Sequence, residues 1–181
     1  NTYPCRARSR TDYRYQVDNT DSGYSDNGGW TDSVSTSPYI GTNYRVIPAA
    51  TVSTATATWR PTITKSDYYP VYVFYTGGTN RATAVTYYVV HSGGTTQFTV
   101  NQQRDGYTWK YIGTYHFNAG TQGCVYVTNQ TPSPTGMYII VDAICVGDGK
   151  GTETRGGVTS GQYKMYEASP YWAQYMKAPS T

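Results

Sequence analysis

The chain is poor in histidine, glutamate, cysteine and charge, and these shortages exclude several classes of function. Its only histidines are His91 and His116, and its only glutamates are Glu153 and Glu167. The sequence has no HExxH, GxSxG or P-loop motif. A zinc hydrolase needs histidine and carboxylate ligands together with a catalytic acid or base. We therefore expect no catalytic residues in this chain.

The small net charge and the short hydrophobic runs argue against nucleic acid and a membrane span. Charged residues make up 14% of the 181 residues, and the net charge of +3 with a pI of about 8.7 is too small to indicate nucleic-acid binding. No run of about 18 apolar residues occurs, so we expect no membrane span. The chain begins with Asn1 rather than Met, so we expect a processed product or an excised fragment.

The three cysteines are Cys5, Cys124 and Cys145, an odd number that forbids complete pairing within the chain. The absence of a CxxC pair argues against a zinc ribbon or thioredoxin-type chemistry. Cys124 and Cys145 fall in expected strands, where a cysteine is usually a small buried hydrophobe. Whether Cys5 pairs with one of them is left open.

Tyrosine and glycine are abundant instead, with 21 and 19 copies. In the middle of the chain, runs rich in valine, threonine and tyrosine are separated by glycine, asparagine and aspartate, which is typical of strands and turns. The runs are Val71–Tyr75, Ala84–His91, Thr95–Asn101 and Thr108–Phe117. They predict a four-stranded antiparallel meander. Within the second run, Tyr87 and Val89 alternate with Tyr88 and Val90, which predicts one apolar and one mixed face.

Five further runs bring the expected total to about nine strands. They are Asp12–Asp18, Tyr44–Pro48, Thr51–Arg60, Gly123–Thr128 and Met137–Val146. The last run is the most continuously apolar and is expected to lie centrally in its sheet. Asn19–Gly29 is expected to be a polar turn region. Together these patterns predict an all-β protein, an antiparallel β-sandwich of the jelly-roll, galactose-binding-like kind, followed by a short C-terminal helix.

Three segments are expected along the chain. Residues 1–12 form an irregular lead-in, residues 13–146 the β-sandwich, and residues 147–181 a glycine-rich connector and a helix at the edge of a neighbouring catalytic domain. Ser169 is a suitable N-cap and Pro170 suits the first helical position. Tyr171, Trp172, Tyr175 and Met176 then share one face of that helix.

An ordered set of short motifs resembles a known family. The motifs include Trp59, Tyr69–Val73, Asn80–Ala82, Tyr87–His91, Val100–Gln102, Trp109–Tyr115 and Val141–Ala143, preceded by Val17–Asn19, Gly23–Ser25, Gly29–Trp30 and Ile40–Arg45. Their order and spacing resemble the golvesin/xanthan-lyase-type domain over roughly residues 13–146. The tail resembles the segment that follows the sandwich in xanthan-lyase-like and N-acetylmuramoyl-L-alanine amidase-like proteins.

The resemblance implies a carbohydrate-binding-like accessory module of a bacterial polysaccharide- or peptidoglycan-degrading protein. The expected partners are a polysaccharide or cell-wall glycan and the catalytic domain of the parent protein. The expected location is secreted, periplasmic or at the cell surface. The alternative is a structural spacer or docking domain that binds no glycan and packs on its catalytic unit through the tail.

Aromatic and polar side chains in the expected loops are the candidate carbohydrate-binding residues. A sugar ring stacks its C–H face on an aromatic ring, and its hydroxyls bond to amides and guanidinium groups. The candidates are Tyr107, Arg81, Tyr39, Gln102 and Asn80. For Gln102, a role in satisfying its own turn is an equal alternative. Trp30, Trp59 and Trp109 are expected in the core instead.

No cofactor is expected, with structural calcium as the one open alternative. Asp18, Asp21 and Asp26 lie in a Gly/Ser-rich region, although their spacing does not match a calcium-binding loop and solvated turn residues are favoured. Asp142 interrupts an apolar run, so a structural hydrogen-bond role is expected for it.

Overall fold

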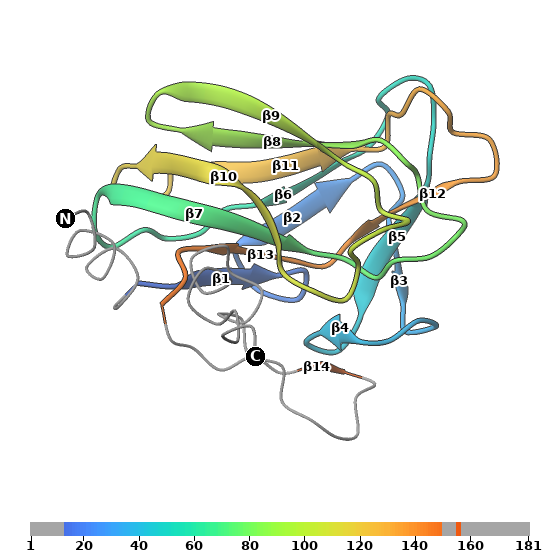
Figure 1. The fold of residues 1–181 in the computed structure, drawn as a ribbon, viewed down its shortest axis with the longest axis horizontal. Coiled ribbons are helices and arrows are strands. Elements are labelled where there is room, and N and C mark those ends of the chain that lie inside the picture. The colour runs from blue at the N-terminus through green and yellow to red at the C-terminus, as the bar shows by residue number, and fades with distance from the viewer. Residues whose placement is uncertain (1–12, 150–154, 157–181) are drawn as a thin grey trace, which may run out of the picture.

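The computed structural model describes residues 13–149 and 155–156, and in these residues it has fourteen strands and no helix. Two antiparallel sheets face each other (Figure 1). The four-stranded sheet has the order β1 (Tyr15–Asp18), β13 (Ala143–Val146), β7 (Asp67–Phe74) and β10 (Lys110–Phe117). The five-stranded sheet has the order β2 (Tyr24–Asn27), β6 (Thr56–Trp59), β11 (Cys124–Thr128), β8 (Val85–His91) and β9 (Gly94–Val100). The predicted all-β antiparallel sandwich is confirmed.

Two small sheets extend the sandwich. One contains β12 (Tyr138–Val141), β5 (Tyr44–Pro48) and β3 (Thr31–Ser33), and the other pairs β14 (Arg155–Gly156) with β4 (Tyr39–Ile40). Strand β2 lies inside the region expected to be only a polar turn, because its backbone pairs with β6 while its side chains stay largely polar. The apolar run 137–146 is split at Asp142, and its second half, β13, lies between two strands as expected.

The predicted central meander is wrong. Strands β7 and β10 pair in one sheet and β8 and β9 in the other, so only β8–β9 is a hairpin. The connections 75–84 and 101–109 each cross between the sheets. Pro70–Phe74 is buried at every position, whereas β8 alternates between buried and half-buried residues. Strand β7 therefore has cover on both faces, which a flat meander with one solvated face does not provide.

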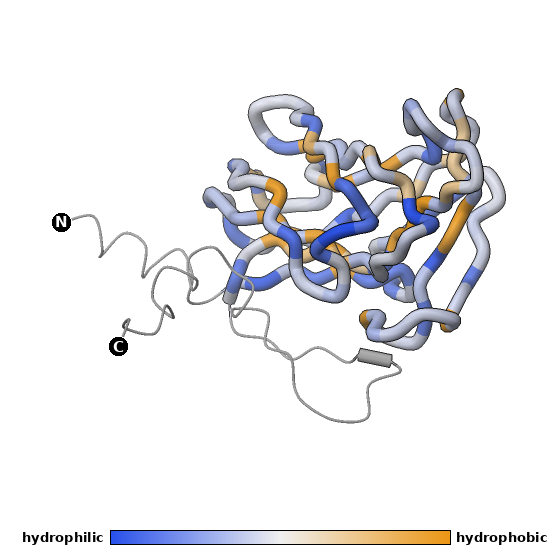
Figure 2. The backbone as a smooth tube through the Cα atoms, turned by 45° about the vertical axis from the view of Figure 1, so that its right-hand side comes forward, coloured by the Kyte–Doolittle hydropathy of each residue, from blue (hydrophilic) through white to orange (hydrophobic). Residues whose placement is uncertain are grey.

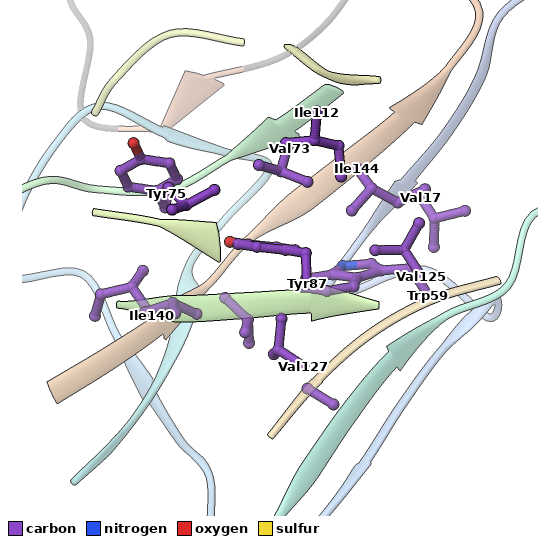
Figure 3. Close-up of a cluster of buried hydrophobic side chains, with 14 of the residues drawn as sticks. Val17, Trp59, Val73, Tyr75, Tyr87, Ile112, Val125, Val127, Ile140 and Ile144 are labelled. Atoms are coloured by element: carbon purple, nitrogen blue, oxygen red, sulfur yellow. The ribbon is translucent and has the colours of Figure 1, made fainter. Parts of the chain in front are cut away.

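The main core lies between the two large sheets. Figure 3 shows Val73, Ile112 and Ile144 of the four-stranded sheet facing Tyr87, Val125 and Val127 of the other. The indole of Trp59 stacks on the ring of Tyr87, with centroids 6.3 Å apart. Along the tube in Figure 2, hydrophobic stretches are interspersed with polar ones.

Several expectations concern single residues. Trp30, Trp59 and Trp109 are buried, which confirms their core role. Cys124 and Cys145 are buried, as expected. Cys5 and the expected helix after Ser169 lie outside the described residues. None of the residues that the structure describes belongs to a helix able to cross a membrane.

Candidate functional site

A pair of tyrosines stands at the centre of the outer face of the five-stranded sheet. Tyr88 on β8 lies directly opposite Tyr126 on β11, and their rings are parallel within 5° at a centroid distance of 4.6 Å. Their sequence neighbours Tyr87 and Val125 point inward and are fully buried. The strand alternation therefore places this aromatic pair on the side away from the core.

Polar side chains continue the face on both sides of the pair. In register with it lie Ser25 and Thr58 on one side and Gln97 on the other. The next row along the strands consists of Asn27, Thr56, Thr128, Thr86 and Thr99. The result is a hydroxyl- and amide-rich surface carried on a rigid sheet.

A hollow of about 330 Å³ opens beside Tyr88. Thr86 and Thr128 line it from the sheet, and the loops contribute Thr51, Gln130, Thr131 and Pro132. All the lining side chains are uncharged. The hollow therefore suits a neutral, hydroxyl-bearing ligand with one apolar face better than an ion.

Buried hydrogen bonds hold the loops around this hollow. The Oδ1 atom of Asn129 accepts from the backbone N–H groups of Thr54 and Ala55 at 2.9 and 3.0 Å. Gln130 donates through Nε2 to the carbonyl of Thr51 at 3.1 Å. Thr131 donates through Oγ1 to the carbonyl of Ala84 at 2.9 Å. Such bonds reduce the ordering cost of binding, because the walls are already positioned.

The phenol group of Tyr126 serves as a neutral hydrogen-bonding group. Burial, with the neighbouring Tyr88 and Cys124, raises the pKa of Tyr126 above its ordinary value. Its hydroxyl therefore keeps its proton at neutral pH and can donate as well as accept.

The structure gathers Arg81, Asn80 and Tyr107 at one end of the sandwich, as the loop hypothesis requires. Arg81 is only 7% exposed, however, and its guanidinium donates to the Thr76 carbonyl at 3.2 Å and to Asn80 Oδ1 at 2.6 Å. Asn80 is exposed. Tyr107 is half-buried, and its hydroxyl donates to the Gly77 carbonyl at 2.7 Å. These contacts tie loops to each other and leave Asn80 as the most accessible of the three.

The other two predicted residues are buried. Tyr39 is 9% exposed and packs against Tyr44, with ring centroids 6.0 Å apart, so its expected exposure is wrong. Its strand, β4, pairs with β14, which the sequence pattern did not indicate. Gln102 is fully buried and hydrogen-bonded to the backbone of Ile140. Gln102 therefore has a structural role, but its side chain bonds to a distant strand and not to its own turn, as the alternative had expected.

The three aspartates considered for calcium do not converge on one point. Asp26 accepts from Arg45 Nε at 2.6 Å and from the Tyr24 hydroxyl at 2.8 Å. Asp21 accepts from the backbone N–H of Asp18 at 2.9 Å. Among the described residues, no three His, Cys, Asp or Glu side chains are arranged to hold a metal ion. These carboxylates serve the fold.

Asp142 has the structural role expected of it. Its Oδ2 accepts from the backbone N–H of Ile40 at 2.9 Å, and its carbonyl accepts from Trp59 Nε1 at 3.2 Å. The bonds hold β4 and the central tryptophan at the point where the apolar run 137–146 is interrupted.

Sequence reasoning did not single out Tyr88 and Tyr126 because it looked for exposed aromatics in loops. The alternation in the run that became β8 already separated Tyr88 from the apolar face. The alternation does not show which strand pairs with β8. It therefore cannot give the register that places Tyr126 beside Tyr88.

Comparisons with known proteins determine the family. The sequence model of the golvesin C-terminal domain matches residues 15–147. The chain belongs to the golvesin C-terminal domain family. Xanthan lyase of Bacillus sp. (strain GL1) is 34% identical over 129 residues, which cover 71% of this chain and 14% of that protein. The resemblance inferred from the motifs is thus confirmed for the sandwich.

Solved structures agree with this assignment. The golvesin C-terminal domain described here superposes on Paenibacillus xanthan lyase with a TM-score of 0.69 and 35% identity, covering 75% of this chain and 13% of that one. The CBM35 of Abf62 from Cellvibrio japonicus matches with a TM-score of 0.54 and 14% identity over 82% of this chain and all of that one. That second likeness shows a shared fold. The chain spans about a seventh of the xanthan lyases it matches.

Proposed function

We propose that this golvesin-family domain is a non-catalytic carbohydrate-binding module whose sugar site is the hollow beside Tyr88. One observation carries the proposal: an aromatic wall and an uncharged rim of hydroxyl and amide groups meet on the outer face of a rigid sheet. A pyranose offers a matching apolar C–H face and a rim of hydroxyls. The likeness in fold to carbohydrate-binding modules supports this proposal.

The proposal extends to the longer protein. Because the relatives are xanthan lyases that extend well beyond this domain, we propose that the domain is an accessory unit of a secreted bacterial polysaccharide-degrading protein. A peptidoglycan-degrading, amidase-like parent is the alternative suggested by the tail sequence. In either case the domain holds the parent on its substrate, and the reaction takes place elsewhere.

The expected affinity is modest. Stacking one ring on an aromatic side chain contributes about 1 kcal/mol. A single site of this kind therefore corresponds to dissociation constants of roughly millimolar to high micromolar. Binding to a long polymer gains further strength when several sites act together.

The test is a calorimetric and NMR titration of the chain with xanthan oligosaccharides, mannohexaose, cellohexaose, chitohexaose and a uronate-bearing oligosaccharide. We expect Tyr88→Ala to weaken binding about five- to ten-fold, in line with the loss of one stacking contact. Tyr138→Ala removes a tyrosine that is 39% exposed and lies outside this hollow, and it should leave binding unchanged.

Variants at the loop end separate the two candidate sites. Tyr107→Ala and Asn80→Ala should leave the affinity near that of the wild type, and Arg81→Ala should lower the stability of the fold rather than the affinity. Loss of binding in the loop variants, with Tyr88→Ala unaffected, would move the site to the loop end.

A docking domain that binds no glycan is the second candidate function, and an apolar cluster favours it. Tyr72, Phe74, Trp109, Ala143 and Cys145 gather with Ile40 away from the main core, on the outer side of the four-stranded sheet. Outer faces of a two-layer sandwich are usually polar, whereas this one is apolar and already covered, with the six side chains at most 2% exposed, so packing against other chain is built into this side of the domain. Failure of the folded domain to bind any of the sugars would favour this function.

A further inference from the structure

A second hollow lies at the end of the sandwich where the β8–β9 turn meets the end of β10 and the start of β7 (Figure 1, left). Its volume is about 440 Å³. It is lined chiefly by Tyr68, His91, Ser92, Thr114, Tyr115 and His116. Both histidines of the chain therefore belong to one surface hollow, together with two tyrosines.

Two aromatic pairs shape this hollow. Tyr68 lies opposite His116 across β7 and β10, and their rings meet edge to face at 5.0 Å and 74°. His91 stacks on Tyr115 at 5.0 Å and 28°. Tyr68 remains 63% exposed although its ring is supported by His116. A supported but exposed phenol ring is a ready stacking surface.

The polar atoms of His91 are used by the fold. Gly93 donates its backbone N–H to Nδ1 at 3.1 Å, so Nδ1 carries no proton. The proton therefore sits on Nε2, which donates to Thr96 Oγ1 at 2.8 Å. Both ring nitrogens of His91 are thus engaged within the fold, and neither is left for a ligand.

His116 is held differently. Its Nδ1 lies 2.8 Å from Ser92 Oγ, and its backbone carbonyl accepts from the Ser92 N–H at 2.9 Å. These two bonds fix the imidazole against the β8–β9 turn. Its Nε2 makes no hydrogen bond to any residue in the described part of the chain. One oriented imidazole nitrogen thus lies next to the exposed ring of Tyr68.

The chemistry of the hollow selects among ligands. None of its lining residues is Lys, Arg, Asp or Glu, so phosphate and carboxylate find no fixed counter-charge. A transition metal needs several imidazole, thiolate or carboxylate ligands, whereas a single imidazole nitrogen is available here. An aromatic ring beside one imidazole and one serine hydroxyl matches a neutral sugar.

We infer that this hollow is a second carbohydrate subsite, in which a neutral pyranose stacks on Tyr68 and places a hydroxyl on His116 Nε2. The inference rests on the proposed carbohydrate-binding function and adds a second site that shares no lining residue with the Tyr88 hollow. Two subsites on one domain would let it bind one polysaccharide at two points, or two chains at once.

The two histidines make the test direct, because their imidazole signals report only on this hollow. The chain is titrated with mannohexaose, cellohexaose and chitohexaose while the ring resonances of His91 and His116 are followed by NMR. We expect a saturable shift of the His116 signals. Tyr68→Ala should weaken that shift at least five-fold in apparent affinity, and Tyr88→Ala should leave it intact.

His116→Gln provides a second variant with less effect on the exposed ring. It should weaken binding at this hollow while leaving the Tyr88-dependent shifts unchanged. If the histidine signals do not shift during a titration that saturates the Tyr88 site, the second subsite alone is overturned. Absence of all binding, with the fold intact, would overturn the proposed function and the subsite with it.

Discussion

The side-chain amide of Gln102 pairs with the backbone of Ile140 as a neighbouring strand would. Gln102 donates through Nε2 to the Ile140 carbonyl at 2.8 Å, and its Oε1 accepts from the Ile140 N–H at 2.9 Å. A further bond runs from Nε2 to the Tyr87 hydroxyl at 3.2 Å. β12 is an edge strand, so this amide satisfies backbone groups that would otherwise be buried without partners.

Replacing Gln102 by Leu should therefore destabilise the fold without changing sugar binding. Leaving the buried Ile140 N–H and carbonyl unpaired costs about 2–4 kcal/mol in the free energy of unfolding. Urea unfolding measures this, with Gln97→Ala on the exposed face of β9 as a control expected within about 0.5 kcal/mol of wild type. A Gln102→Leu variant as stable as wild type would show that these hydrogen bonds add little.

The contact between the rings of Tyr88 and Tyr126 should stabilise the fold. A double-mutant cycle with Tyr88→Ala, Tyr126→Ala and the double variant isolates the ring contact from the rest of each side chain. We expect a coupling of about 0.5–1.5 kcal/mol, the range for stacked aromatic pairs. Purely additive effects on the free energy of unfolding would contradict a direct contact between the rings.

Asp18 should make stability fall as pH rises through the acid range. Burial raises the pKa of Asp18 above 3.8, despite hydrogen bonds from Thr20 and Asp142 that lower it. Since the folded state then holds the proton more tightly than the unfolded state, stability is greatest below about pH 4 and is lost as pH approaches the raised pKa. Relative to Asp18→Asn, which cannot titrate, the wild type should lose stability as pH rises above the ordinary pKa of an aspartate and through the raised pKa of Asp18. Parallel pH profiles of the free energy of unfolding for the wild type and Asp18→Asn, measured by urea unfolding, would refute this prediction.

Gly28 and Gly29 give a matched test of close packing. Both have positive φ, at 92° and 100°, but a Cβ on Gly28 would lie 2.5 Å from the Cα of Ala55, whereas a Cβ on Gly29 would meet nothing within 4 Å. Gly29→Ala should cost about 1–2 kcal/mol of backbone strain. Gly28→Ala should cost clearly more, and thermal unfolding of both variants compares them. Equal losses would mean that the loop moves aside.

Local sequence pattern was enough for several elements. Thr51–Arg60 was predicted as a strand with Trp59 in the core, and Trp59 is buried in β6 together with Ala57. Tyr44–Pro48 was predicted with the bounds that the structure has. A two-residue period of apolar residues and glycines at turns are local features of the sequence. They predict strands correctly because one face of each strand must be buried.

The local sequence pattern could not predict which strands pair with each other. The turn after β7 looked like that of a hairpin, yet β7 pairs with β10 and β13, which lie far from it in sequence. Short polar strands such as β2 were missed because backbone pairing, rather than side-chain character, makes them strands.

Residue type and spacing are enough to predict the fold class, the inward faces of the strands and the family. Which polar and aromatic side chains are accessible depends on the tertiary structure. Arg81 and Gln102 occur in loop sequences but are buried, since Arg81 bonds to the Thr76 carbonyl within its own loop and Gln102 to the backbone of the distant Ile140. Tyr88 and Tyr126, or Tyr68 and His116, become neighbours only when strands from distant parts of the chain pair in register.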